Sequence, residues 1–237
     1  MKVLISPQSL EEARECFQGG ADIIDVKNPS EGSLGANFPW VIRSIRKAIP
    51  IYIPISATVG DVPNKPGTVS LAALGAAFAG ASFVKIGLAG ASTESEGIAI
   101  MKAVKRTIDE YQLPTLVVAA GYAEGEAIGS LSHSLIPKIA QKARCDFAMI
   151  DTFDKKIKQS IFDILTIEDL KVFINQCHKK QVQTALGGAI QKKHIGLLKD
   201  LRPEVVGVRG AVCHQGDRLN GKIKAGLVQD FISALKN

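Results

Sequence analysis

The sequence has little of several things that mark particular classes of protein. Of its 237 residues only 5% are aromatic, and four are cysteine. The cysteines lie far apart without a Cys-x-x-Cys pair, so neither a zinc site nor a disulfide framework is expected. No pair of carboxylates or histidines has convincing metal-ligand spacing, and we expect no metal and no cofactor. No segment combines low hydrophobicity with a long run of like charge, which argues against a disordered chain.

Long hydrophobic runs are also scarce. The uncharged segment 69–84 has 16 residues rich in alanine and glycine, which is too short for a membrane-spanning helix. We predict that it contains a helix over 70–79 that turns at Gly80 into a strand. The first residues, Met1 to Pro7, are too few to form the apolar part of a signal peptide. We therefore expect a cytoplasmic protein that does not contact a membrane.

The charge is moderately basic, with 29 lysines and arginines against 23 acidic residues and a net charge of +6. The basic residues form short separate runs, such as Lys179-Lys180 and Lys192-Lys193, and aromatic residues are not interleaved with them. Charge that is spread in this way is typical of solvated helix faces rather than of a nucleic-acid surface. The sequence thus favours a small anionic molecule as partner, and no nucleic acid.

Short apolar segments alternate with longer segments of helical periodicity. Eight strands are predicted, at 2–6, 21–27, 51–56, 82–88, 115–121, 146–151, 183–188 and 205–210. Each gap between strand starts is long enough for a helix, as parallel crossover connections require. A doubly wound dinucleotide-binding sheet would have a glycine-rich loop after its first strand, and none is present. We predict an α/β protein, a (β/α)8 TIM barrel that forms one domain over residues 1–237.

Three segments carry signals for helix starts. Ser9 precedes two glutamates and is expected to cap the first helix, Phe38-Pro39-Trp40 opens the second, and Thr166 opens the sixth. These starts fall between predicted strands. They therefore support the same alternating architecture.

Five charged residues stand on or just after strands that are otherwise apolar: Asp25, Lys27, Lys85, Asp151 and Lys155. Strand alternation puts the side chains of Asp25 and Lys27 on one side of their strand and those of the apolar residues Ile24 and Val26 on the other. Catalytic residues of barrel enzymes lie at the carboxyl ends of the strands. We therefore expect these five side chains to converge at the mouth of the barrel.

Buried charges are costly unless they are paired, so this set needs an explanation. One interpretation is a structural ion pair among Asp25, Lys27 and Asp151. The other is catalysis, because crowding and partial burial lower the pKa of a lysine, and a neutral amine attacks a carbonyl to give an imine. An imine is an electron sink for aldol addition or elimination, while a neighbouring lysine or carboxylate moves protons. Three lysines and two aspartates from three strands favour catalysis.

A second feature concerns anions. Predicted strand seven ends in Gly187-Gly188 and strand eight in Arg209-Gly210, where many barrels bind a phosphate group through backbone N–H groups. Glycine pairs also serve as simple turns, but the arginine strengthens the interpretation as a phosphate site. Gly187, Gly188, Arg209 and Gly210 are our candidate residues for binding a phosphorylated substrate.

Five segments form a distinctive set. They are GADIIDVKNP (20–29), EGSLGA (31–36), FVKIGL (83–88), DTFDK (151–155) and VRGA (208–211). Over nearly the whole chain the sequence resembles the (5-formylfuran-3-yl)methyl phosphate synthases of methanofuran biosynthesis. The resemblance implies a carbon–oxygen lyase acting on phosphates. It would condense two molecules of glyceraldehyde 3-phosphate through a lysine Schiff base, with loss of one phosphate and water, to a furan aldehyde phosphate.

The same resemblance implies roles for the five charged residues. Lys27 would form the imine and Lys85 would accept a proton, while the other three would assist proton transfer and orient the substrate. Two alternatives stay open from the residues alone. The first is an aldolase for a phosphorylated sugar that also uses a lysine imine, and the second is a non-catalytic barrel that binds an anionic ligand or RNA. The sequence also leaves open whether the chain forms a homo-oligomer.

Overall fold

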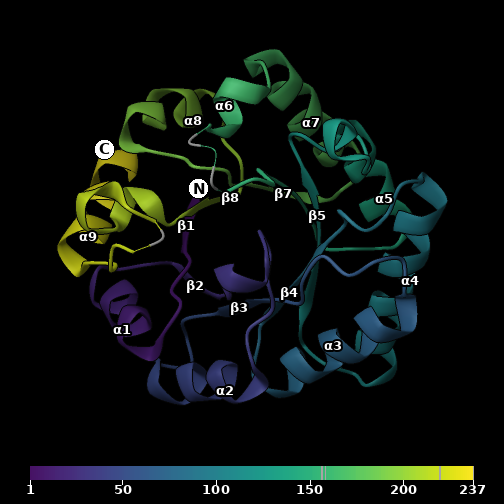
Figure 1. Cartoon of the computed structure of the whole chain (residues 1–237), viewed down its shortest axis with the longest axis horizontal. Helices are drawn as coiled ribbons and strands as arrows, with labels where there is room; N and C mark the ends of the chain where they lie inside the picture. The colour runs from purple at the N-terminus through teal and green to yellow at the C-terminus, as the bar shows by residue number, and fades with distance from the viewer. Residues whose placement is uncertain (156, 158, 219, 237) are drawn as a thin grey trace.

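The computed structural model describes residues 1–155, 157, 159–218 and 220–236, and its centre is a closed barrel of parallel strands (Figure 1). The strands are β1 (Lys2–Ile5), β2 (Ile23–Val26), β3 (Ile55–Thr58), β4 (Phe83–Gly87), β5 (Leu116–Tyr122), β6 (Phe147–Asp151), β7 (Gln183–Leu186) and β8 (Val205–Val208). Their order in the barrel follows the chain, and β8 pairs with β1 to close it. The prediction of a (β/α)8 TIM barrel is confirmed.

Helices form a ring around the strands (Figure 1). They are α1 (Leu10–Gln18), α2 (Pro39–Ala48), α3 (Pro66–Phe78), α4 (Glu94–Glu110), α5 (Ile136–Lys142), α6 (Ile161–Ile164), α7 (Ile167–Lys179), α8 (Ile195–Leu201) and α9 (Ala225–Lys236). Short 3-10 helices lie in the loops: η1 (Pro29–Glu31), η2 (Glu126–Ile128), η3 (His133–Leu135), η4 (Lys192–His194), η5 (Gly210–Val212) and η6 (His214–Gly216). Among the described residues, no helix combines the length and the apolar character needed to cross a membrane.

The predicted helix starts are confirmed. The Ser9 hydroxyl accepts a hydrogen bond from the backbone N–H of Glu12 and so caps α1. Pro39 is the first residue of α2, where its missing N–H costs no hydrogen bond. Thr166 forms a reciprocal capping box with Asp169. The helix that it opens is α7 rather than the sixth, because the short α6 precedes it.

Two elements begin four residues away from their predicted starts, whereas the other strand ends differ from the prediction by at most two residues. The third strand begins at Ile55 and not at Ile51, and Ile51 is 85% exposed. Pro50 and Pro54 flank the apolar segment that misled the prediction, and its backbone turns back on itself through the bond from the Ile53 N–H to the Pro50 carbonyl. Helix α3 begins at Pro66, four residues before the predicted start, because proline fits the first helical turn.

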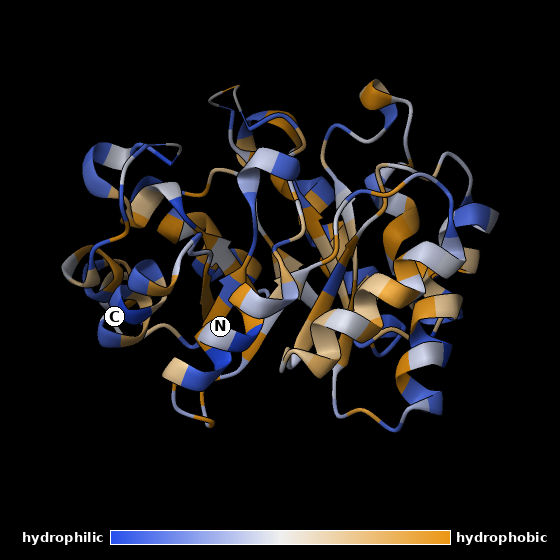
Figure 2. Ribbon diagram, turned by 60° about the horizontal axis from the view of Figure 1, so that its bottom comes forward, coloured by the Kyte–Doolittle hydropathy of each residue, from blue (hydrophilic) through white to orange (hydrophobic). Residues whose placement is uncertain are grey.

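The strands separate two apolar clusters. The larger cluster lies between strands and helices and includes Ile24 and Val26 of β2. The smaller cluster fills the inside of the barrel and includes Leu4, Val118 and Met149. Strands are mostly orange in Figure 2, whereas helices carry both colours, as expected when one helix face packs on the barrel and the other meets solvent. The inner cluster forms an apolar floor beneath the mouth of the barrel.

A buried ion pair joins the two ends of the chain around the barrel. Arg209, which follows β8, bonds through two guanidinium nitrogens to the Glu12 carboxylate of α1, at 2.8 and 3.1 Å. Glu12 also accepts the backbone N–H of Gln8 and of Ile223. The pair therefore ties β8, α1 and the segment before α9 together. The four cysteines, Cys16, Cys145, Cys177 and Cys213, are all buried as free thiols.

Candidate active site

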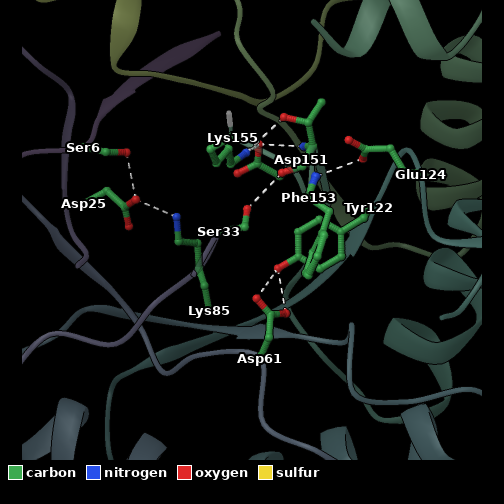
Figure 3. Close-up of polar contacts among 11 residues, drawn as sticks. Ser6, Asp25, Ser33, Asp61, Lys85, Tyr122, Glu124, Asp151, Phe153 and Lys155 are labelled. Carbon is green, nitrogen blue, oxygen red and sulfur yellow. Dashed lines mark hydrogen bonds and ion pairs between the residues drawn. The ribbon is translucent and has the colours of Figure 1, made fainter. Parts of the chain in front are cut away.

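The five charged residues predicted from the sequence converge at the mouth of the barrel, at the carboxyl ends of β2, β4 and β6. Figure 3 shows Asp25, Lys85, Asp151 and Lys155 among them. Asp25, Lys27, Lys85 and Asp151 are each at most 5% exposed. As expected from strand alternation, Asp25 points inward while Ile24 and Val26 pack under the helices. The structure brings this set together, although it spans more than a hundred residues of sequence.

One ion pair links β2 and β4. The ammonium group of Lys85 donates to Asp25 Oδ2 at 2.7 Å, and the same oxygen accepts the Ser6 hydroxyl at 3.0 Å (Figure 3). Burial alone would raise the pKa of Asp25, but the positive charges of Lys85 and Lys27 outweigh it and hold the pKa below its ordinary value. Asp25 is therefore an anion that fixes the position of the Lys85 ammonium group.

A second ion pair follows β6. The ammonium group of Lys155 lies 2.5 Å from Asp151 Oδ1 and 3.1 Å from the Thr152 hydroxyl. Burial opposes ionisation of Asp151, yet the charges of Lys155 and Lys27 lower its pKa well below the ordinary value. Burial also lowers the pKa of Lys155, and the charge of Asp151 opposes that shift. Asp151 is therefore an anion that holds the Lys155 ammonium group in place.

Lys27 differs from the other two lysines. Its ammonium group forms no ion pair or hydrogen bond with any residue in the described part of the chain. Burial lowers its pKa to about 7, helped by the charges of Lys155 and Lys85 and opposed by Asp151. Lys27 is thus the buried lysine that is neutral in a large fraction of molecules near neutral pH, which is the form that attacks a carbonyl carbon.

This pKa predicts the pH dependence of any reaction that begins with attack by Lys27. Below about pH 7 the amine is protonated and cannot attack, so kcat/KM should rise with pH through about 7. A free lysine would instead give a rise near its ordinary value of 10.5. The rate of borohydride trapping with unphosphorylated glyceraldehyde measures this directly, because that aldehyde lacks a phosphate group that titrates. If the trapping rate rose with pH only well above pH 8, the assignment of Lys27 as the attacking amine would be contradicted.

The loops after β7 and β8 close a narrow cavity of about 30 Å³ around the three lysines and Asp151. Gly187, Gly188 and Gly210 line it. Gly188 has a φ of +100°, and a Cβ atom there would lie 2.8 Å from the Thr152 side chain, so only glycine fits. The candidate phosphate-binding glycines therefore lie beside the lysines, but the Gly187 N–H already donates to the Ile150 carbonyl at 2.8 Å, so its backbone does not offer a free donor.

Arg209 lines the same cavity, but protein groups occupy its guanidinium. Besides the two bonds to Glu12, it donates to the backbone carbonyls of Ser6 and Arg218 at 2.8 and 2.9 Å. Its side chain is nearly fully buried. Arg209 therefore positions the loops around the cavity through these carbonyls, and the Glu12 carboxylate balances its charge.

Sequence reasoning missed a second polar cluster at the mouth. The Tyr122 hydroxyl lies 2.6 Å from both oxygens of Asp61, and burial raises the pKa of both side chains (Figure 3). A Cβ atom at Gly87, two residues after Lys85, would lie 2.0 Å from Asp61, so glycine leaves the room for this pair. Strand alternation could have indicated Tyr122, which is in register with Asp151, whereas Asp61 lies in a loop without a pattern.

Arg218 is the other residue that the sequence did not single out. It lines the cavity beside Lys155, and its Nε atom is buried without a hydrogen-bond partner among the described residues. In the same described part of the chain, no group of three or more His, Cys, Asp or Glu side chains could hold a metal ion. The described side chains at the mouth of the barrel offer ammonium, guanidinium, carboxylate and phenol groups.

Fold and site together define a (β/α)8 barrel whose mouth holds a buried cluster of lysines and aspartates. The family model of the 4-HFC-P synthases matches residues 3–232, and the chain belongs to this family. The (5-formylfuran-3-yl)methyl phosphate synthase of Methanocaldococcus jannaschii is 49% identical over 231 residues, which cover 98% of each chain. That of Methanobrevibacter smithii is 51% identical over 223 residues, 94% of each chain. The resemblance found in the sequence is confirmed.

Solved structures of more distant barrels share the fold. One is 3-hexulose-6-phosphate synthase, which has a TM-score of 0.67 and 18% sequence identity over 99% of this chain and 100% of the other. Another is phosphoribosyl anthranilate isomerase from Thermus thermophilus, with a TM-score of 0.65 and 16% identity over 100% and 98% of the two chains. At these identities the likeness concerns the architecture alone.

Proposed function

We propose that this protein is a lyase that condenses two molecules of glyceraldehyde 3-phosphate to (5-formylfuran-3-yl)methyl phosphate, a precursor of methanofuran. Lys27 forms a Schiff base with the carbonyl group of one molecule and releases one water, and hydrolysis of the imine later consumes one water to free the product. The net reaction loses one phosphate and two waters, which balances the atoms of two trioses against one furan aldehyde phosphate. The name shared by the relatives supports the product.

The observation that carries the proposal is the contrast among the three lysines. Asp25 holds Lys85 and Asp151 holds Lys155, whereas Lys27 has no such partner among the described residues and a pKa of about 7. A paired ammonium group is a poor nucleophile, and a neutral buried amine is a good one. The alternative of a purely structural ion-pair network gives no reason to keep a third lysine unpaired in the cavity.

The two ion pairs flank the amine and can move protons. Carbon–carbon bond formation requires removal of a proton next to the imine, and the later eliminations require protons on the departing oxygens. We assign the first step to Lys85, as the family resemblance implies. Its ammonium group first passes a proton to the Asp25 carboxylate that it contacts at 2.7 Å, and the neutral amine then accepts the proton from carbon. The Lys155 and Asp151 pair assists the proton transfers and orients the substrate.

The phosphate groups of the substrates call for anion-binding groups near the amine. Gly187, Gly188 and Gly210 bring the backbone to the edge of the cavity, and Arg209 positions the loops there. We propose these four residues as part of the phosphate site. The overall positive charge of the chain also favours approach of a doubly phosphorylated reaction pair.

Incubation of the purified protein with glyceraldehyde 3-phosphate tests the reaction. We expect an ultraviolet-absorbing furan aldehyde phosphate, identified by mass, together with one inorganic phosphate per product. An aldolase would instead yield a sugar phosphate that reverts to its substrates, without furan absorbance or phosphate release. A protein that only binds anions would give neither product. Boiled protein and the Lys27→Met variant serve as controls, since the latter removes the amine but keeps a side chain of similar length.

A further inference from the structure

The cavity around the lysines opens into a second, larger one. The inner chamber, about 30 Å³, contains Lys27 and Lys85, and the outer chamber, about 780 Å³, lies over the loops after β6, β7 and β8. The walls that both chambers share include Lys155, Gly210 and Arg218. The inner chamber is narrow in this structure, about 30 Å³ against the roughly 300 Å³ or more of a usual small-molecule site. A triose phosphate therefore has most of its room in the outer chamber.

A substrate that reacts at Lys27 must consequently extend across the junction of the chambers. Its carbonyl end occupies the inner chamber, and the rest of the molecule passes Arg218 and Lys155 into the outer chamber. The outer chamber has the volume of an ordinary small-molecule site. Its wall carries Lys155, Lys192 and Arg218 against one acidic residue, Asp217. An anionic group at the outer end of the substrate would thus meet a lining of net positive charge.

At the junction Arg218 has an unused donor. Its Nε atom is fully buried and has no hydrogen-bond partner in the described part of the chain, where Arg218 also forms no ion pair. Buried polar atoms nearly always have a partner, so this nitrogen points to an acceptor that arrives with a ligand. The nearby carboxylate of Asp151 bonds through Oδ1 to Lys155 and to the Thr152 N–H, and its charge acts on Arg218 without a hydrogen bond to Nε. Arg209 bonds to the Arg218 carbonyl and so fixes the backbone of this residue.

We propose that Arg218 binds the phosphate group of the substrate at the junction of the two chambers, so that the carbonyl carbon reaches Lys27. A guanidinium group binds phosphate through parallel hydrogen bonds, which suits an arginine with a free buried nitrogen. The assignment rests on the proposed function for the identity of the carbonyl compound. The proposal gives the two arginines different roles. Arg209 is a positioning residue held by Glu12, and Arg218 touches the ligand.

The test compares two aldehydes and uses inorganic phosphate as an independent probe. Lys27 is trapped with borohydride in the presence of glyceraldehyde 3-phosphate or of glyceraldehyde, and the concentration that gives half-maximal adduct is measured by intact mass. For Arg218→Ala we expect that concentration to rise about tenfold to hundredfold with the phosphorylated aldehyde only. Affinity for inorganic phosphate, measured by calorimetry, should fall by a similar factor. Arg218→Lys should lose less, because it keeps the charge.

Arg106→Ala is the matched control, because Arg106 is an exposed arginine of α4 far from the mouth. Arg218→Gln keeps most of the volume of the side chain, and thermal unfolding shows whether each variant is folded. Unchanged phosphate affinity and unchanged aldehyde preference in Arg218→Ala and Arg218→Gln would overturn the proposal, and so would equal weakening with both aldehydes. Absence of any adduct on wild-type Lys27 would instead contradict the proposed function, while the phosphate titration would still decide the role of Arg218.

Discussion

The Lys27→Arg variant should lose furan formation by a factor on the order of 10⁴ or more, while its fold and its phosphate affinity survive. Arginine keeps a positive charge at the end of a long side chain, but its guanidinium group does not deprotonate in proteins and cannot form the imine. Product formation is measured by absorbance and mass. The adduct is measured after borohydride reduction with glyceraldehyde 3-phosphate, followed by peptide mapping.

Two further variants make this result specific. Lys138→Arg changes a half-exposed lysine that pairs with Glu94 on the surface, and it should behave as wild type. Lys85→Arg should slow turnover and still give the adduct on Lys27, since it retains the charge beside Asp25 and removes only the proton acceptor. An adduct that maps to Lys85 or Lys155, or that persists in Lys27→Arg, would contradict the assigned roles.

The Glu12→Ala variant should lower the free energy of unfolding by about 3 to 5 kcal/mol. The substitution leaves the guanidinium of Arg209 buried without its carboxylate, and it also removes the acceptor of the Gln8 and Ile223 N–H groups. These contacts join the first and last elements of the barrel. Their loss should therefore destabilise the closure of the barrel. Chemical denaturation measures it as a lower midpoint with an unchanged slope.

The neighbouring residue supplies the control. Glu11 pairs with Lys222 at 3.6 Å, but both side chains are more than 70% exposed. Exposed ion pairs contribute at most about 1 kcal/mol, so Glu11→Ala should leave the midpoint almost unchanged. Equal effects of the two substitutions would show that Arg209 finds a new partner or solvent once Glu12 is gone.

Much of the fold follows from patterns that are local in the chain. Alternation of short apolar strands with helices, and capping residues such as Ser9 and Thr166, are sufficient to predict the barrel. The start of β3 was not predictable in this way, because Ile51 and Tyr52 look like strand residues but are exposed in a turn between prolines. An apolar segment predicts a buried strand only where its backbone can form hydrogen bonds to a neighbouring strand. Proline lacks the N–H donor and so limits where those bonds can begin.

The site was predictable in part for the same reason. Residues at strand ends, such as Asp25 and Lys85, have positions that alternation fixes. Asp61 and Arg218 lie in loops, where the spacing of residues does not indicate which way a side chain points, so neither residue was predicted. The sequence also cannot say which lysine lacks a partner, because that depends on distances between strands that are far apart in the chain. Likewise, the partner of Arg209 lies 197 residues away.

The buried cysteines give this barrel a built-in reporter of its opening motions. Burial raises the pKa of the Cys145 and Cys177 thiols to about 12 and that of the Cys16 thiol well above its ordinary value, so thiol reagents meet almost no thiolate in the folded protein. Modification must then wait for local or global opening. Cys16 and Cys213 lie close to the seam between β1 and β8, whereas Cys145 and Cys177 lie elsewhere in the ring. Their relative labelling rates therefore reveal whether the seam opens before the rest of the barrel.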